Sequence, residues 1–224
     1  MLRRFSRRRS GSTSGGAEQL RPVAAVADPA ATRERLTERF LAAQEHYRNK
    51  LYEKAVAGFA AVEAGCLPGL ASLFVMAKVR RGASFMALKR WGDALGVFDE
   101  LAAEIDELPG FDRTRLPDRV ATIYWSRSVC LEQLGRMTEA CARIADLIEE
   151  VGSGTTSTQR NWVASAYLLQ ARAAQARGRF DEAHRAIDAA ITQCSGTDEP
   201  ELRSTLHDAE QMKQALQARV RPAR

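Results

Sequence analysis

The chain has 224 residues, 45% of them hydrophobic, and a formal net charge of +5. This length suits one domain or two small ones, and the composition is typical of a soluble folded protein. No apolar run approaches the roughly 18 residues that a membrane-spanning helix needs. The N-terminal arginines lead into Gly and Ser and not into an apolar core, which argues against a secretory signal.

The positive charge lies at the N-terminus. Residues 1–35 hold eight arginines and three acidic residues, a net charge of +5, so the remainder is neutral overall. Residues 1–28 are predicted to form a disordered arm, because their Arg, Ser and Gly side chains offer too little apolar surface to offset the ordering entropy. Such an arm can bind nucleic acid or anionic lipid, serve as a phosphorylated or organelle-targeting segment, or have no binding role. Its basic residues are Arg3, Arg4, Arg7, Arg8 and Arg9.

From Pro29 onward every segment is predicted to be helical, because proline stands early and glycine stands late in most of them. No stretch alternates between apolar and polar residues as a strand does. The predicted helices span residues 29–49, 52–64, 68–88, 91–107, 117–135, 137–151, 158–177, 180–194 and 199–219.

A short string recurs four times: an aromatic residue or Met, then Ala three positions later, then Phe or Ile four positions after that. Each copy stands two residues after a Lys or Gly. A recurring unit of this kind indicates stacked supersecondary units, each of which leaves an apolar face for its neighbour. The copies are Tyr52-Ala55-Phe59, Trp91-Ala94-Phe98, Met137-Ala140-Ile144 and Phe180-Ala183-Ile187, preceded by Lys50, Lys89, Gly135 and Gly178.

With small residues at Ala43, Gly82, Ser128 and Ala171, the pattern resembles the tetratricopeptide repeat. The resemblance implies an all-α, right-handed α-solenoid of stacked antiparallel hairpins over residues 29–219. The small residue of each first helix is expected to meet the alanine of the second. Arg39 and Lys78 depart from the pattern, because they stand where a large side chain is expected. The repeats would span residues 36–66, 75–107, 121–151 and 164–194, with a capping helix over 199–219.

In this family the first helices of successive repeats line a concave groove. The corresponding positions here combine aromatic, Met and aliphatic residues with Gln, Glu and Arg, which suits an apolar peptide or helix held by a few polar contacts. The alternative is that they pack against the last helix, the arm or a second copy of the chain. The implied groove residues are Phe40, Gln44, Tyr47, Arg48, Met76, Val79, Met86, Trp125, Val129, Glu132, Gln133, Leu168, Arg172 and Gln175.

Other candidate sites are weak. Lys78, Arg80 and Arg81, followed by Lys89 and Arg90, form either a basic stripe or an ordinary solvated helix surface. The four cysteines form no Cys-x-x-Cys pair, so they are predicted to be small core residues in a reducing, cytoplasmic compartment. The three histidines stand at no metal-ligand spacing, and neither a phosphate loop nor a nucleophile motif is present. No cofactor or metal is expected, and no enzymatic activity.

The sequence therefore predicts a non-catalytic interaction module, an adaptor, scaffold or assembly factor, that binds a peptide or protein segment in a groove. The alternative is a protein that binds nucleic acid or an anionic surface through its arm, with the repeats used for dimerisation or recruitment. Repeat stacks favour binding surfaces over catalysis, but the repeated residues specify packing and so do not identify the partner.

Overall fold

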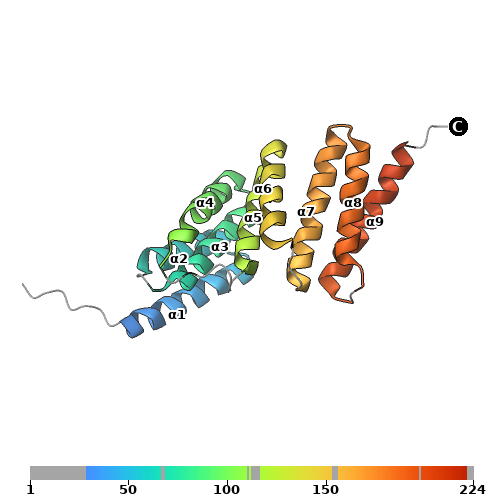
Figure 1. The fold of residues 1–224 in the computed structure, drawn as a ribbon. Helices are drawn as coiled ribbons and strands as arrows, with labels where there is room; N and C mark the ends of the chain where they lie inside the picture. The colour runs from blue at the N-terminus through green and yellow to red at the C-terminus, as the bar shows by residue number, and fades with distance from the viewer. Residues whose placement is uncertain are drawn as a thin grey trace, which may run out of the picture.

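A computed structural model describes residues 29–66, 69–109, 111, 117–152, 156–196 and 198–220, and the predicted arm lies outside this part. The described residues form helices in succession and contain no strand (Figure 1). Residues 105–107 add a short 3-10 turn after α4. The helices are α1 (Pro29–Arg48), α2 (Tyr52–Gly65), α3 (Ala71–Ala87), α4 (Trp91–Glu104), α5 (Pro117–Gln133), α6 (Met137–Val151), α7 (Ser157–Ala176), α8 (Phe180–Cys194) and α9 (Pro200–Val220).

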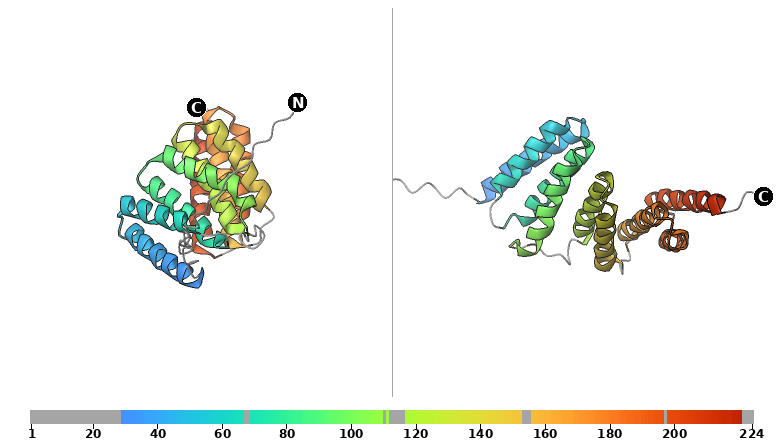
Figure 2. Two further views of the ribbon diagram at one scale, coloured as in Figure 1. Left: turned by 90° about the vertical axis from the view of Figure 1, so that its left-hand side faces the viewer. Right: turned by 90° about the horizontal axis from the view of Figure 1, so that it is seen from above.

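The helices pack in chain order as an all-α solenoid. Each helix contacts the next, and the stack runs from α1 at one end to α9 at the other (Figures 1 and 2). The predicted helix limits hold to within a few residues. The clearest difference is α3, which begins at Ala71 and not at the predicted Pro68, because Gly69 adopts a left-handed φ of 97° that a helix cannot include.

The same tight turn joins the two helices of every hairpin. The residue two positions before each copy of the repeated string has a left-handed backbone: φ is 60° at Lys50, 58° at Lys89, 75° at Gly135 and 72° at Gly178. At each turn, the amide of this residue and the next amide donate to carbonyls in the last turn of the preceding helix, at 2.8–3.0 Å. This is the glycine-type helix terminus, and two of the four turns hold lysine in the glycine position.

The alanine and the following Phe or Ile of the repeated string form the inner seam of the stack. All eight residues have no exposed surface: Ala55, Phe59, Ala94, Phe98, Ala140, Ile144, Ala183 and Ile187. The residue that starts each string is peripheral by comparison, since Tyr52, Trp91 and Met137 are half-buried and Phe180 is 41% exposed. The string therefore specifies how hairpins pack together.

Small residues allow the helices of a hairpin to approach closely. A Cβ atom on Gly82 of α3 would lie 2.5 Å from Cζ of Phe98 on α4, and one on Gly58 of α2 would lie 2.7 Å from Cβ of Ala43 on α1. At Gly82 the ring of Phe98 occupies the space that a side chain would fill. A ring can lie across a helix only where that helix has no side chain.

The last helix, α9, covers α7 and α8. Leu202, Ala209 and Leu216 are buried in a cluster with residues of those helices, and Leu206 and Met212 pack at its margin. No helix of the described part is long and apolar enough to cross a bilayer.

Candidate functional site

The predicted groove residues all lie on α1, α3, α5 and α7, and they differ in accessibility. Phe40, Val79 and Leu168 are only 5–9% exposed and belong to three different core clusters. Phe40 packs on Phe59 with ring centroids 5.4 Å apart. These three side chains contribute mainly to packing. The exposed or half-buried positions are Gln44, Tyr47, Arg48, Met76, Met86, Trp125, Val129, Glu132, Gln133, Arg172 and Gln175.

Two tryptophans meet between α5 and α7. The rings of Trp125 and Trp162 are 5.8 Å apart at their centroids and inclined by 50°, and both residues are half-buried. The indole Nε1 of Trp162 is buried and has no hydrogen-bond partner among the described residues. Trp162 was not among the predicted groove residues, because it precedes the positions that the repeat pattern assigns to the groove and no local signal marks it.

An ion pair joins two predicted groove residues from neighbouring repeats. Arg172 of α7 donates from Nε and from a terminal nitrogen to the two carboxylate oxygens of Glu132 on α5, at 2.9 and 3.2 Å. The Glu132 side chain is 17% exposed and the Arg172 side chain is 42% exposed. The paired geometry holds both charged groups in place on the same side of the stack as Trp125.

A hollow of about 320 Å³ opens between α1 and α3, and we call it the α1/α3 hollow. One side is formed by Arg33, Thr37 and Leu41, which follow one another at one-turn spacing along α1. The structure also brings two predicted groove residues, Phe40 and Met76, together in it. Leu41 was not predicted, although it is 57% exposed. A large apolar residue inside a polar surface stripe was the only sequence signal available.

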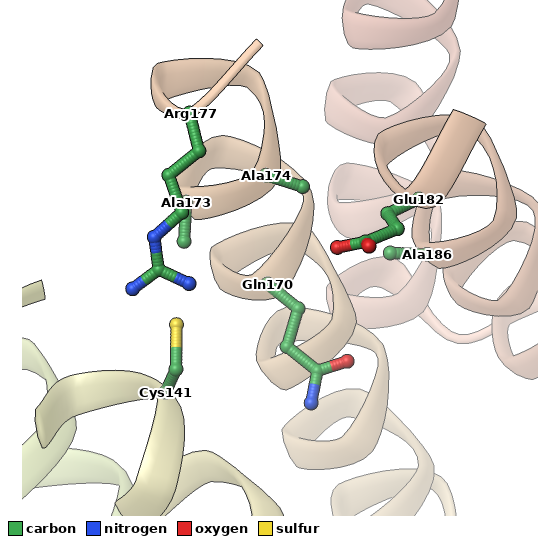
Figure 3. Close-up of a pocket in the computed structure, with 7 residues that line it drawn as sticks. All are labelled: Cys141, Gln170, Ala173, Ala174, Arg177, Glu182 and Ala186. Atoms are coloured by element: carbon green, nitrogen blue, oxygen red, sulfur yellow. The ribbon is translucent and has the colours of Figure 1, made fainter. Parts of the chain in front are cut away.

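Two further hollows occupy equivalent places in successive repeats. One, of about 300 Å³, opens between α4 and α6 over α5; the other, of about 210 Å³, opens between α6 and α8 over α7 (Figure 3). Counted from the repeated alanine, Leu95 and Glu139 in the first correspond to Cys141 and Glu182 in the second. Figure 3 shows Arg177 extending from α7 toward the Cys141 thiol. Their recurrence marks these hollows as gaps between successive even-numbered helices.

Burial disfavours the thiolate form of all four cysteines. Cys130 and Cys194 are buried, as predicted, whereas Cys66 and Cys141 are half-buried, and none forms a disulfide. Burial raises the pKa of the Cys130 thiol to about 12, with a smaller contribution from the carboxylate of Asp99. Burial also raises the pKa of the other three thiols. Because the thiolate is the reactive form, raised pKa values make these cysteines poor nucleophiles.

The basic segment on α3 is neither a basic stripe nor a fully solvated surface. The side chain of Lys78 is 6% exposed, and its Nζ lies 2.7 Å from Glu104 and 3.4 Å from Glu100 on α4. Arg81 pairs with Glu63 on α2 at 2.8 Å. Burial raises the pKa of Glu63, and Arg81 opposes this shift. These charges therefore bind neighbouring helices together.

Lys78 stands where the repeat pattern expects a large residue, and its environment explains the departure. The ammonium lies 5.2 Å from the centre of the Phe74 ring, so the long stem fills core space while the charge reaches the two carboxylates. Arg39, at the corresponding place in α1, is exposed.

The predicted arm residues, Arg3 to Arg9, lie outside the described residues. Within the described ranges, no group of three or more metal-binding side chains gathers at one point. The sequence of the chain matches no protein-family model and none of the curated proteins.

Proposed function

We propose that this protein is a non-catalytic, cytoplasmic interaction module of tetratricopeptide-repeat type, which binds a peptide or protein segment across α1, α3, α5 and α7. The supporting observation is the unequal spacing of the helices. Odd-numbered helices contact one another directly, α1 with α3, α3 with α5 and α5 with α7, whereas contacts between even-numbered helices are at most weak in the described residues. From α4 to α8, hollows open between successive even-numbered helices, whereas the α1/α3 hollow is the one described between odd-numbered helices. Such a stack curves toward its odd-numbered helices, and curvature creates an extended binding face.

The side chains on that face suit a mixed ligand. Trp125 and Val129 are half-buried, so each offers apolar surface without being enclosed. The Glu132–Arg172 pair lies beyond them and presents both charges in a defined orientation. An aromatic anchor surrounded by fixed polar groups is typical of the residues that dominate peptide binding.

The proposal can be tested by partner capture. The full chain is used as bait in a lysate of the cells that naturally produce it, and captured proteins are identified by mass spectrometry. The affinity of a purified partner is then measured by calorimetry. We expect Trp125→Ala to weaken binding by about thirtyfold or more, because truncating a central aromatic anchor costs about 2 kcal/mol or more. Arg172→Ala should weaken it less.

Arg143→Ala is the matched control, since Arg143 is an ion-paired and similarly exposed arginine on α6. Its affinity should equal that of the wild type. Helical circular dichroism should be the same for all variants. Unaltered capture by both Trp125→Ala and Arg172→Ala would contradict the proposal.

A further inference from the structure

The lining of the α1/α3 hollow suits the side chains of a binding partner, because it is mostly apolar and carries one charged residue. Arg33, Thr37 and Leu41 form one wall, and Phe40 and Leu73, each 9% exposed, are the most buried of the lining residues. The 57% exposed Leu41 is the most exposed of the large hydrophobic residues in the described part of the chain. A volume of about 320 Å³ is at the lower limit of small-molecule pockets, which are roughly 300–1,000 Å³. Most of the lining is apolar, with Leu70 and Met76 beside Phe40, Leu41 and Leu73, which suits apolar side chains of a macromolecule.

The charge around the hollow is one-sided. Among the described residues that line it, Arg33 alone is charged, and it has no ion-pair partner within the described part of the chain. Arg33 also lies close to the start of α1, whose first turn contains no acidic residue. The partial positive charge of a helix N-terminus adds to that of the guanidinium. A carboxylate is the group that both would attract.

The polar groups in the hollow favour a helical ligand over an extended one. Besides Arg33, the lining offers the hydroxyls of Thr37 and Ser72, and the Thr37 hydroxyl already donates to the carbonyl of Arg33 at 2.8 Å. An extended segment would bury backbone amides that find few hydrogen-bond partners in the hollow, whereas the backbone amides of a helix are hydrogen-bonded within the helix. Amphipathic helices also commonly bind with their apolar face in a hydrophobic groove of the partner.

We propose that the α1/α3 hollow binds an amphipathic helix of a partner protein, with large apolar side chains entering beside Leu41 and an Asp or Glu pairing with Arg33. Arg33 and Leu41 are eight residues apart on α1, which is about 12 Å along the axis. The acidic residue therefore stands about two turns from the apolar residue that contacts Leu41. This inference rests on the proposed function, because it specifies the chemistry of one partner segment.

The test uses a phage-displayed library of random peptides about 20 residues long, because isolated helices shorter than about 12–15 residues are marginal. The full chain is the target, and selected peptides are synthesised with fluorescein for anisotropy titrations. We expect enriched peptides to carry apolar residues at helical spacing and an acidic residue about two turns away. Selection on Arg33→Glu should replace that acidic residue with Lys or Arg.

Affinities of the selected peptides give the second readout. Leu41→Asp should weaken binding about tenfold or more, since burial of a leucine is lost. Arg33→Glu should weaken it about fivefold, the upper range for an exposed ion pair. The matched controls are Leu51→Asp, which replaces a 45% exposed leucine elsewhere, and Arg35→Glu, an exposed arginine outside the hollow. Both controls should bind as the wild type does.

Failure of this inference and failure of the proposed function would give different results. Peptides that lose affinity with Trp125→Ala but not with Leu41→Asp would overturn this inference and support the proposed function. Enrichment of no peptide would count against both. A dimer in sedimentation that Leu41→Asp dissociates would make a second copy the occupant. Binding of a synthetic peptide of residues 17–28 that Leu41→Asp abolishes would make the chain's own N-terminal segment the occupant. Either result would overturn the proposal.

Discussion

Replacing Lys89 by glycine should stabilise the protein, although a lysine side chain is lost and nothing is gained in contact. Lys89 is exposed and has a φ of 58°, in the turn where the third and fourth hairpins hold Gly135 and Gly178. A left-handed backbone costs an L-residue roughly 1–2 kcal/mol. Glycine relieves this strain, but its greater freedom in the unfolded chain costs roughly 0.5–1 kcal/mol on folding and offsets part of the gain. The net gain in the free energy of unfolding should be about 0.5–1 kcal/mol.

Lys54→Gly provides the matched control. Lys54 is an exposed lysine in α2, so the same chemical change there places glycine inside a helix. It should lower the free energy of unfolding by roughly 0.5–1 kcal/mol. Urea titrations followed by circular dichroism measure both variants, and the expected changes have opposite signs. The reasoning is refuted if Lys89→Gly is destabilised as much as Lys54→Gly.

Two further predictions concern the packing between helices. Gly82→Ala should lower the free energy of unfolding by about 1–3 kcal/mol, because its Cβ would lie 2.5 Å from the buried Phe98 ring. Gly96→Ala is the control, since a Cβ there meets no described atom within 4 Å, and it should be neutral or stabilising in the same urea titration. Equal effects of the two variants would contradict the close contact at Gly82. Glu63 has a folded-state pKa raised by burial, so its proton is bound more tightly in the folded than in the unfolded chain, and its contribution to stability falls as pH rises from 4.5 through the folded pKa. The Glu63→Gln variant lacks this decline, so the unfolding free energy of the wild type minus that of the variant should fall over the same pH range. A difference that stays constant with pH would contradict the raised pKa.

The helices and their order could be predicted because their signals are local. Proline at the start of α5, for example, and glycine after α8 act within a single turn of chain, whatever lies elsewhere. The pairing into hairpins followed from four copies of one string whose alanine and Phe or Ile are all buried. Each hairpin joins segments that are adjacent in sequence, so no long-range contact had to be anticipated.

The candidate site was only partly predictable. The repeat pattern placed Glu132 and Arg172 on the same side of the stack, and they form an ion pair there. The pattern also assigned Phe40 to the groove, yet that side chain is almost entirely buried against Phe59. A position in a repeat specifies which face a residue occupies, whereas its exposure depends on how deeply neighbouring helices enclose it.

The sequence by itself determined the all-helical fold, the hairpin turns and the buried seam, because each depends on residues close together in the chain. Only the tertiary structure decided that Lys78 is held by carboxylates of α4, that Trp162 meets Trp125, and that Leu41 borders a hollow with Arg33. The physical reason is the same in all three cases. These environments depend on the spacing between helices, and that spacing results from the packing of the whole stack.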